Sequence, residues 1–191
     1  MQNAVLILAA GASKRLGRPK QQLVFQQQTL LQRIIHTAIE LQSGPIFCVV
    51  KPEDTHVVPS QITTLINHQW QEGMSSSIRC GMNEIQHSFP TVQTVIITVC
   101  DQPFITVDLL QQLIREHQQT GKPMIASSYD SVMGTPVLFH HSVFPLLQEI
   151  KGDKGARQLL QQHADRVGLV NFPLGNIDVD TEEDYERLIK R

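Results

Sequence analysis

Cysteine is scarce in this sequence, and its three residues are too widely spaced to form a familiar motif. Cys48, Cys80 and Cys100 contain no Cys-x-x-Cys pair and are odd in number, which argues against a disulfide framework or a cysteine zinc site. Apolar or small residues flank each of them, so we expect buried, reduced and unreactive thiols. The eight histidines have no His-Glu-x-x-His spacing, which argues against catalytic zinc.

Long apolar runs are also missing. No run reaches the length of a membrane span, and residues 1–10 lack the basic start and cleavage pattern of a signal peptide. Together with reduced thiols, these absences favour the cytoplasm and a protein with no membrane partner. The net charge of -2 and the pI near 6.4 argue against a surface that binds nucleic acid.

Several well-known enzyme loops are absent as well. A Walker loop has four residues between its glycines, whereas five separate Gly11 from Gly17, and Lys20 comes three residues later. The dinucleotide-binding fingerprint begins with Gly-x-Gly, which the residues from Gly11 do not supply. A nucleophile elbow and a Cys-His signature are missing too, so covalent or hydrolytic chemistry has no evident agent.

The sequence does contain short apolar runs that alternate with helical patterns. The apolar runs cover residues 4–10, 46–50, 95–100, 124–126, 136–139 and 167–172. Helical spacing covers residues 29–41, 106–118 and 155–163, and Thr106 and Thr181 are predicted N-caps. This alternation predicts a mostly parallel sheet covered on both faces. With 191 residues, we expect one α/β domain over 1–191, a three-layer, Rossmann-like arrangement.

A glycine-containing, cationic loop follows the first apolar run directly. Its four cations are Lys14, Arg15, Arg18 and Lys20. Small residues free backbone N–H groups for phosphate oxygens, and the cations offer positive charge to a polyanion. The loop therefore predicts a site for a nucleoside triphosphate. The alternative is a solvated basic turn, which we favour less because open α/β sheets bind ligands just after their core strands.

Carboxylates occur at two other places where a buried segment ends. Asp101 follows the apolar run 95–100, and Asp178 and Asp180 alternate so that they share one face of an extended segment. Magnesium uses one or two carboxylates together with substrate phosphates, so these acids beside a phosphate loop predict a Mg²⁺ site. The alternatives are a strand-end turn for Asp101 and a helix-capping turn for the other two.

A nucleotidyl transfer fits this set of residues. When the acceptor is itself a phosphate, the nucleophile is already an anion and needs no activated side chain. Catalysis then rests on positioning and on neutralising the triphosphate with metal, Lys and Arg.

Taken in order, the motifs resemble those of the MobA-like nucleotidyltransferases, most closely their molybdenum cofactor cytidylyltransferase branch. The signature Leu-Ala-Ala-Gly-x-Ser-x-Arg-Met-Gly-x-x-Lys is similar to the segment from Leu8 to Lys20, with Leu16 in place of Met. The resemblance continues in residues 72–77, 101–103, 134–136, 152–157 and 178–181. It covers nearly the whole chain and implies the α/β fold of nucleotide-diphospho-sugar transferases.

The resemblance also implies a donor site, residue by residue. The implied nucleotide-binding residues are Leu8, Ala9, Ala10, Gly11, Ala12, Arg15, Lys20, Gly73 and Ser77. The implied catalytic residues are Lys20, Arg15 and Asp101, and the implied Mg²⁺ ligands are Asp101 and Asp180. For Ser77 the alternative is a serine cap on a helix that runs to about Glu84.

The acceptor would lie against later segments. The implied acceptor-binding residues are Gly134, Thr135, Pro136, Asp153, Arg157 and Asp178. A strand-entry turn at 134–136 and a glycine-broken helix start at 152–157 explain these residues equally well. Thr135 departs from the His or Asn that is commoner in the family, which bears on acceptor recognition.

The implied reaction joins CMP from CTP to the terminal phosphate of molybdopterin-type cofactor and releases pyrophosphate. Ala10 favours CTP over GTP, because the guanylyl branch carries glycine there. A molybdoenzyme of the xanthine dehydrogenase type, or its chaperone, is the implied protein partner. Three alternatives stay open: a guanylyltransferase, a nucleotidyltransferase for sugar or polyol phosphates, and a non-catalytic maturation partner of a molybdoenzyme.

Overall fold

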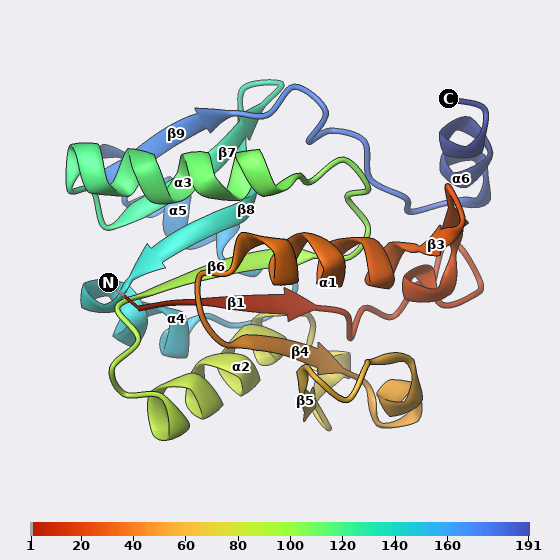
Figure 1. The fold of residues 1–191 in the computed structure, drawn as a ribbon, viewed down its shortest axis with the longest axis horizontal. Helices are drawn as coiled ribbons and strands as arrows, with labels where there is room; N and C mark the ends of the chain where they lie inside the picture. Colours follow the sequence, from red (N-terminus) through yellow and green to blue (C-terminus); the bar gives the residue numbers. More distant parts are fainter. Residues whose placement is uncertain (1) are drawn as a thin grey trace.

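The computed structural model describes residues 2–191, and its centre is a seven-stranded sheet (Figure 1). The strands are β1 Asn3–Leu8, β4 Ile46–Val50, β5 Thr63–Ile66, β6 Thr94–Val99, β7 Met124–Tyr129, β8 Val132–His140 and β9 Val167–Asn171. Their order in the sheet is β5-β4-β1-β6-β8-β7-β9, and β8 is antiparallel to both of its neighbours. The remaining pairings are parallel, which confirms the expected mostly parallel sheet.

Helices cover both faces of the sheet. They are α1 Leu30–Leu41, α2 Met74–Ser88, α3 Val107–Thr120, α4 Phe144–Glu149, α5 Arg157–Gln162 and α6 Glu182–Ile189. In β1, Val5 and Ile7 pack with α1 and α3, while Leu6 and Leu8 pack with α2, α4 and α5. Successive side chains of a strand point to opposite faces, so one short apolar run supplies two cores. The result is the predicted three-layer α/β arrangement.

Side-chain caps fix where three of the helices begin. The Thr29 hydroxyl accepts a hydrogen bond from the Gln32 amide, and the Gln32 side chain accepts one from the Thr29 amide, which forms a capping box. Thr106 and Thr181 also accept hydrogen bonds at the starts of α3 and α6, which confirms both predicted N-caps. Thr181, the N-cap of the last helix, therefore directly follows Asp180.

Two adjacent parallel strands bring the predicted donor residues together. β1 pairs with β6 in a register that sets Leu8 opposite Val99. The cationic loop leaves β1 and Asp101 follows β6, so both emerge at the same edge of the sheet. The chain end also reaches this edge, because the Val179 amide donates a hydrogen bond to the Asp101 carbonyl oxygen, 3.1 Å away.

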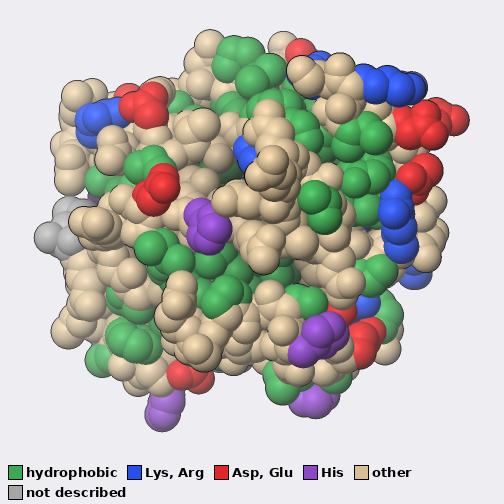
Figure 2. All heavy atoms as spheres, turned by 45° about the vertical axis from the view of Figure 1, so that its right-hand side comes forward, with side chains coloured by type: hydrophobic (Ala, Val, Ile, Leu, Met, Phe, Trp, Pro, Cys, Tyr) green, Lys and Arg blue, Asp and Glu red, His purple; other side chains and the backbone are tan. Residues whose placement is uncertain are grey.

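A small hairpin and the last helix close this edge. β2 (Val24–Phe25) pairs with β3 (Gln28–Thr29), and the intervening Gln26 and Gln27 have φ of 50° and 67° and form the turn between them. Figure 1 shows α6 beside β3, at the end toward which β1 points. In Figure 2, acidic and basic side chains lie next to one another along the right-hand edge of the view.

Some expectations differ from the structure. β5 and α4 lie outside the apolar runs and helical patterns described above. Cys48 and Cys100 are buried, but Cys80 on α2 is only partly buried, because it lies beside the edge strand with its Sγ 3.8 Å from the Ile66 carbonyl oxygen. Within residues 2–191 no helix combines the length and the apolar character needed for a membrane crossing.

Candidate functional site

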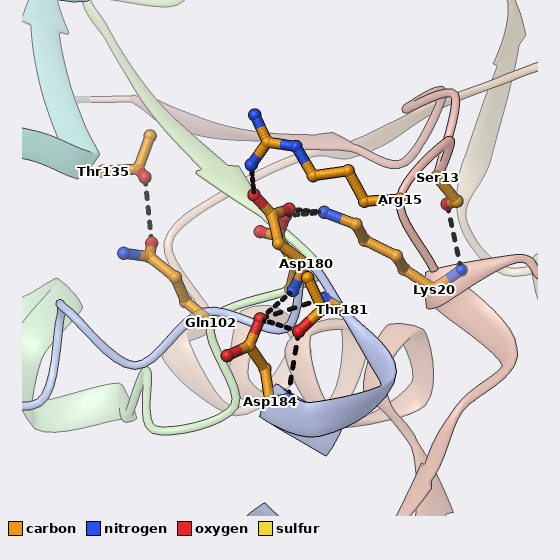
Figure 3. Close-up of polar contacts among 9 residues, drawn as sticks. Ser13, Arg15, Lys20, Gln102, Thr135, Asp180, Thr181 and Asp184 are labelled. Carbon is orange, nitrogen blue, oxygen red and sulfur yellow. Dashed lines mark hydrogen bonds and ion pairs between the residues drawn. The ribbon is translucent and has the colours of Figure 1, made fainter. Parts of the chain in front are cut away.

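Four predicted site residues meet in one ion cluster (Figure 3). The Lys20 ammonium lies 3.2 Å from Oδ2 of Asp101 and also contacts Oδ1 of Asp180. Nη1 of Arg15 lies 3.1 Å from the other oxygen of Asp180. The loop, the end of β6 and the tail of the chain thus converge, although Lys20 and Asp180 are 160 residues apart in sequence.

The Lys20 ammonium is held in its charged form. Its side chain is only 15% exposed, and this burial alone would lower its pKa. The carboxylates of Asp101 and Asp180 outweigh that effect and raise the pKa above its ordinary value. Lys20 is therefore a permanent, partly desolvated positive charge at neutral pH.

Local geometry of the loop orients Lys20. Ser13 has φ of 49°, and its hydroxyl accepts a hydrogen bond from the Lys20 amide at 3.2 Å (Figure 3). The Gly17 amide donates to the Ser13 carbonyl oxygen at 3.0 Å, and Gly17 has φ of 73°, a region that glycine enters without steric cost. These contacts curl the loop, from which the Lys20 side chain reaches the carboxylates of Asp101 and Asp180.

The start of α6 binds the other side of the loop. The Arg18 guanidinium lies 2.5 Å from the Glu182 carboxylate and 5.0 Å from the centre of the Tyr185 ring. The Asp184 carboxylate accepts hydrogen bonds from the Thr181 amide and hydroxyl, which fixes the turn that follows Asp180 (Figure 3). Arg18 is thus engaged with α6, away from the ion cluster.

A cavity of about 590 Å³ lies beside the ion cluster. Every residue that the sequence assigned to nucleotide, metal or catalysis lines it: Leu8, Ala9, Ala10, Gly11, Ala12, Arg15, Lys20, Gly73, Ser77, Asp101 and Asp180. Asp178 also lines this cavity. We call it the donor cavity. Its size lies in the ordinary range for small-molecule sites.

The start of α2 forms another wall of the donor cavity. Gly73 is the N-cap, with φ of 110°, and the helix begins at Met74, so Ser77 lies in the first turn and the capping alternative for Ser77 is wrong. The Asn67 side-chain amide donates to the Ser77 hydroxyl at 3.0 Å. A Cβ on Gly73 would lie 2.8 Å from Cα of Asp153, so the 73–74 and 152–155 segments pack closely.

A second cavity of about 300 Å³ adjoins the first, and Met74 and Asp153 line both. Four of the predicted acceptor residues line it, namely Gly134, Thr135, Asp153 and Arg157. We call it the second cavity. Pro136 is buried in β8 and its carbonyl oxygen accepts a hydrogen bond from the Ser127 hydroxyl, whereas Asp178 lies on the donor cavity instead.

Gln102 links the two cavities and was not anticipated. Its side-chain oxygen accepts a hydrogen bond from the Thr135 hydroxyl at 2.9 Å (Figure 3). Its side-chain nitrogen donates to the Gly175 carbonyl oxygen at 2.8 Å. Gln102 is buried, so these contacts tie the segment after Asp101 to β8 and to the chain tail. In the sequence, only its position between Asp101 and Pro103, within one of the family-like segments, pointed to a role for Gln102.

Asp101 and Asp180 fit a divalent cation that takes two carboxylate ligands from the protein and its other ligands from the substrate and water. Asp101 and Asp180 offer carboxylate oxygens around one point, which the Lys20 ammonium now contacts. Among residues 2–191 no group of three or more acidic, histidine or cysteine side chains is arranged to hold a metal ion. Two carboxylates completed by phosphate oxygens and water are a usual Mg²⁺ arrangement, so triphosphate would have to supply the remaining ligands.

Comparisons with known proteins find relatives that match this chain over nearly its whole length. The chain is 30% identical over 199 residues to nicotine blue oxidoreductase of Paenarthrobacter nicotinovorans, covering 96% of this chain and 95% of that protein. It is 25% identical to the purine catabolism protein PucB of Bacillus subtilis, over 95% and 93% of the two chains. A probable molybdenum cofactor guanylyltransferase of Bacillus cytotoxicus is 22% identical, over 97% and 96%.

Solved structures share the fold. Rv0371c of Mycobacterium tuberculosis H37Rv superposes with a TM-score of 0.86 at 24% identity, covering 100% of this chain and 98% of that chain. A structure of Rv0371c in complex with manganese gives a TM-score of 0.81 at 22% identity, over 100% and 99%.

The family model for the MobA-like NTP transferase domain matches residues 5–167. This span includes the cationic loop, Asp101 and the residues that line the second cavity. The chain therefore belongs to the MobA-like NTP transferase domain family of nucleotidyltransferases.

Proposed function

We propose that this protein transfers CMP from CTP to the phosphate of a molybdopterin-type cofactor and releases pyrophosphate. The observation that carries the proposal is the convergence of Lys20, Asp101 and Asp180 beside a cavity lined by the cationic loop. A cation held between two carboxylates, next to free loop amides, is suited to a metal-bound triphosphate. We further propose that residues 1–191 act as one domain.

The residues divide the reaction between them. An oxygen of the acceptor phosphate attacks the α-phosphorus of CTP, the new P–O bond forms, and the bond to the β-phosphate breaks, so that pyrophosphate leaves with the electron pair. Lys20 and Arg15 stabilise the negative charge that develops on the triphosphate. Asp101 and Asp180 would hold Mg²⁺, which neutralises phosphate charge when bound.

The preference for CTP rests on Ala10. Ala10 lines the donor cavity and is almost fully buried. Its methyl group would take up space that a glycine would leave to a larger purine base. Ala10→Gly should therefore shift the ratio of kcat/KM values from CTP toward GTP.

The acceptor proposal rests on the second cavity. It opens beside the donor cavity, and Lys154 and Arg157 among its lining residues can attract a phosphate. The probable molybdenum cofactor guanylyltransferase among the relatives supports a molybdopterin-type acceptor. A molybdoenzyme of the xanthine dehydrogenase type, or its chaperone, would then receive the product.

Pyrophosphate release measured separately with CTP, GTP, ATP and UTP, each with and without molybdopterin and Mg²⁺, tests the proposal. We expect release only with the cofactor acceptor and metal, and fastest with CTP. Release with a sugar or polyol phosphate would favour that alternative. Cofactor binding without release would favour a maturation partner, and reduction of nicotine blue without any nucleotidyl transfer would contradict the proposal.

A further inference from the structure

A buried charged network lies outside the ion cluster and has no part in the transfer as described. Nζ of Lys51 lies 3.3 Å from Oδ2 of Asp54, and the two side chains are only 11% and 4% exposed. The side-chain amide of Gln21, which is also buried, donates to the same Asp54 oxygen at 2.7 Å. Burial of an ion pair costs desolvation free energy, so such a pair often serves to fix a geometry.

Both ends of this network reach the donor cavity. Gln21 directly follows Lys20 and lines the cavity. At the other end, Nζ of Lys51 lies 5.4 Å from the centre of the Trp70 ring, within the range of a cation–π contact. Trp70 lines the same cavity as Gly73, on the side assigned to the base.

The position of Trp70 is fixed by its own turn as well. The Gly73 amide donates to the Trp70 carbonyl oxygen at 3.1 Å, which closes the 3₁₀ turn Trp70–Glu72. Just before it, the Gln69 amide donates to the Asn67 side chain at 2.9 Å. Asn67 also donates to the hydroxyl of Ser77, so the segment just before Trp70 and the Ser77 side chain are held by the same residue.

We propose that Trp70 is a base-binding residue whose indole ring packs against the nucleoside of the bound nucleotide, and that Lys51, Asp54 and Gln21 are positioning residues for this ring. The ammonium of Lys51 supports the indole, and Asp54 joins Lys51 to Gln21 and hence to the turn that carries Lys20. The distance between the base wall and the phosphate site is thereby fixed before substrate binds. This inference rests on the proposed function.

Trp70 is the only tryptophan in the sequence, so its fluorescence reports on this site alone. Titration with CTP and with inorganic tripolyphosphate separates base contact from phosphate contact. We expect CTP to change the emission in parallel with binding measured by calorimetry, and tripolyphosphate to bind without this change. Binding of CTP by calorimetry with unaltered Trp70 emission would overturn the inference and leave the proposed function standing. No binding of CTP at all would contradict both.

Substitution of Trp70 measures how much the indole contributes to the affinity for CTP. Base stacking on an aromatic side chain is worth roughly 5- to 150-fold in affinity, so Trp70→Ala should raise the Kd of CTP by about that factor. Trp70→Phe should restore most of the affinity. Neither variant should alter the Kd of tripolyphosphate, a readout that a general folding defect would disturb. Equal CTP affinity of Trp70→Ala and the wild type would sink the idea.

The positioning residues need a double variant, because Lys51→Met alone would leave the Asp54 charge buried and unpaired. Lys51→Met with Asp54→Asn removes both charges and keeps an acceptor for Gln21. We expect the KM of CTP to rise several-fold with little change in kcat. The matched control is Arg115→Met with Asp108→Asn, which removes an exposed ion pair on α3. An unchanged KM in the first double variant, or an equal rise in the control, would contradict the positioning role.

Discussion

The donor cavity and the second cavity adjoin but are built from different chemistry. Charged side chains from three distant segments meet at the donor cavity, where Lys20 bridges Asp101 and Asp180. Apolar and aromatic side chains dominate the second cavity, namely Met74, Ile78, Ile97, Tyr129, Val132, Met133, Val137, Phe139 and Leu160. Charge can hold a triphosphate of any base, whereas a shaped apolar pocket selects by fit.

This difference explains why the donor is easier to infer than the acceptor. Phosphate binding requires positive charge and metal binding requires carboxylate oxygens at the same edge of the sheet. A cation after β1 and a carboxylate after β6 can therefore be recognised in the sequence. An apolar pocket can be filled by many combinations of side chains of similar volume. The second cavity therefore carries less information about its ligand than the donor cavity does.

The largest expected effect is on the metal side of the donor cavity. Asp101→Asn keeps the shape of the side chain but removes the negative charge of a proposed Mg²⁺ ligand, so kcat should fall on the order of 10³-fold. Acceptor binding in the second cavity should not change. The control is Asp108→Asn on the exposed start of α3. Wild-type pyrophosphate release by Asp101→Asn would refute the metal assignment.

A somewhat smaller effect is expected from the lysine between the carboxylates. Lys20→Ala removes a preorganised cation that faces developing charge, which should slow turnover by about 10²- to 10³-fold. Lys190→Ala, which removes an exposed lysine of the C-terminal turn, is the control. An unchanged rate would show that Lys20 only balances the charge of the carboxylates. The assignment of Lys20 as a catalytic residue would then be wrong.

The smallest expected effect concerns the boundary between the two cavities. It is measured as a change in the thermal stability of the protein. Gly73→Ala places a Cβ against Asp153 at φ of 110°, so it should cost about 1–3 kcal/mol and lower Tm by several degrees. Gly11→Ala has open space at its Cβ, so it should leave Tm unchanged while it weakens CTP binding. Equal thermal stability of the two variants would contradict the close packing of the cavities.

Much of the fold followed from the sequence, because local patterns determine it. The apolar run of β1 and the caps at Thr106 and Thr181 predicted a covered parallel sheet and two helix starts correctly. The neighbouring positions of the cationic loop and Asp101 follow from parallel strands that end at one edge. The start of α2 was harder, since Gly73 rather than a serine forms the N-cap.

The parts of the site that were missed depend on contacts between distant segments. Gln102 forms hydrogen bonds with Thr135 and Gly175, which lie far from it in sequence. Trp70 contacts Lys51, which directly follows β4. Such pairings arise only when the whole sheet is assembled, so neither spacing nor periodicity reveals them. The expectation that Cys80 is buried was wrong for the same reason, because its surroundings are set by the edge strand β5.

The most direct test of the account is a crystal structure of the protein with CTP and Mn²⁺, in which anomalous scattering locates the metal. We predict a single strong peak in contact with the carboxylates of Asp101 and Asp180 and with phosphate oxygens of CTP. The Lys20 ammonium should then contact phosphate rather than bridge the two acids. A metal peak and a triphosphate away from these carboxylates would contradict the assignment of the donor cavity.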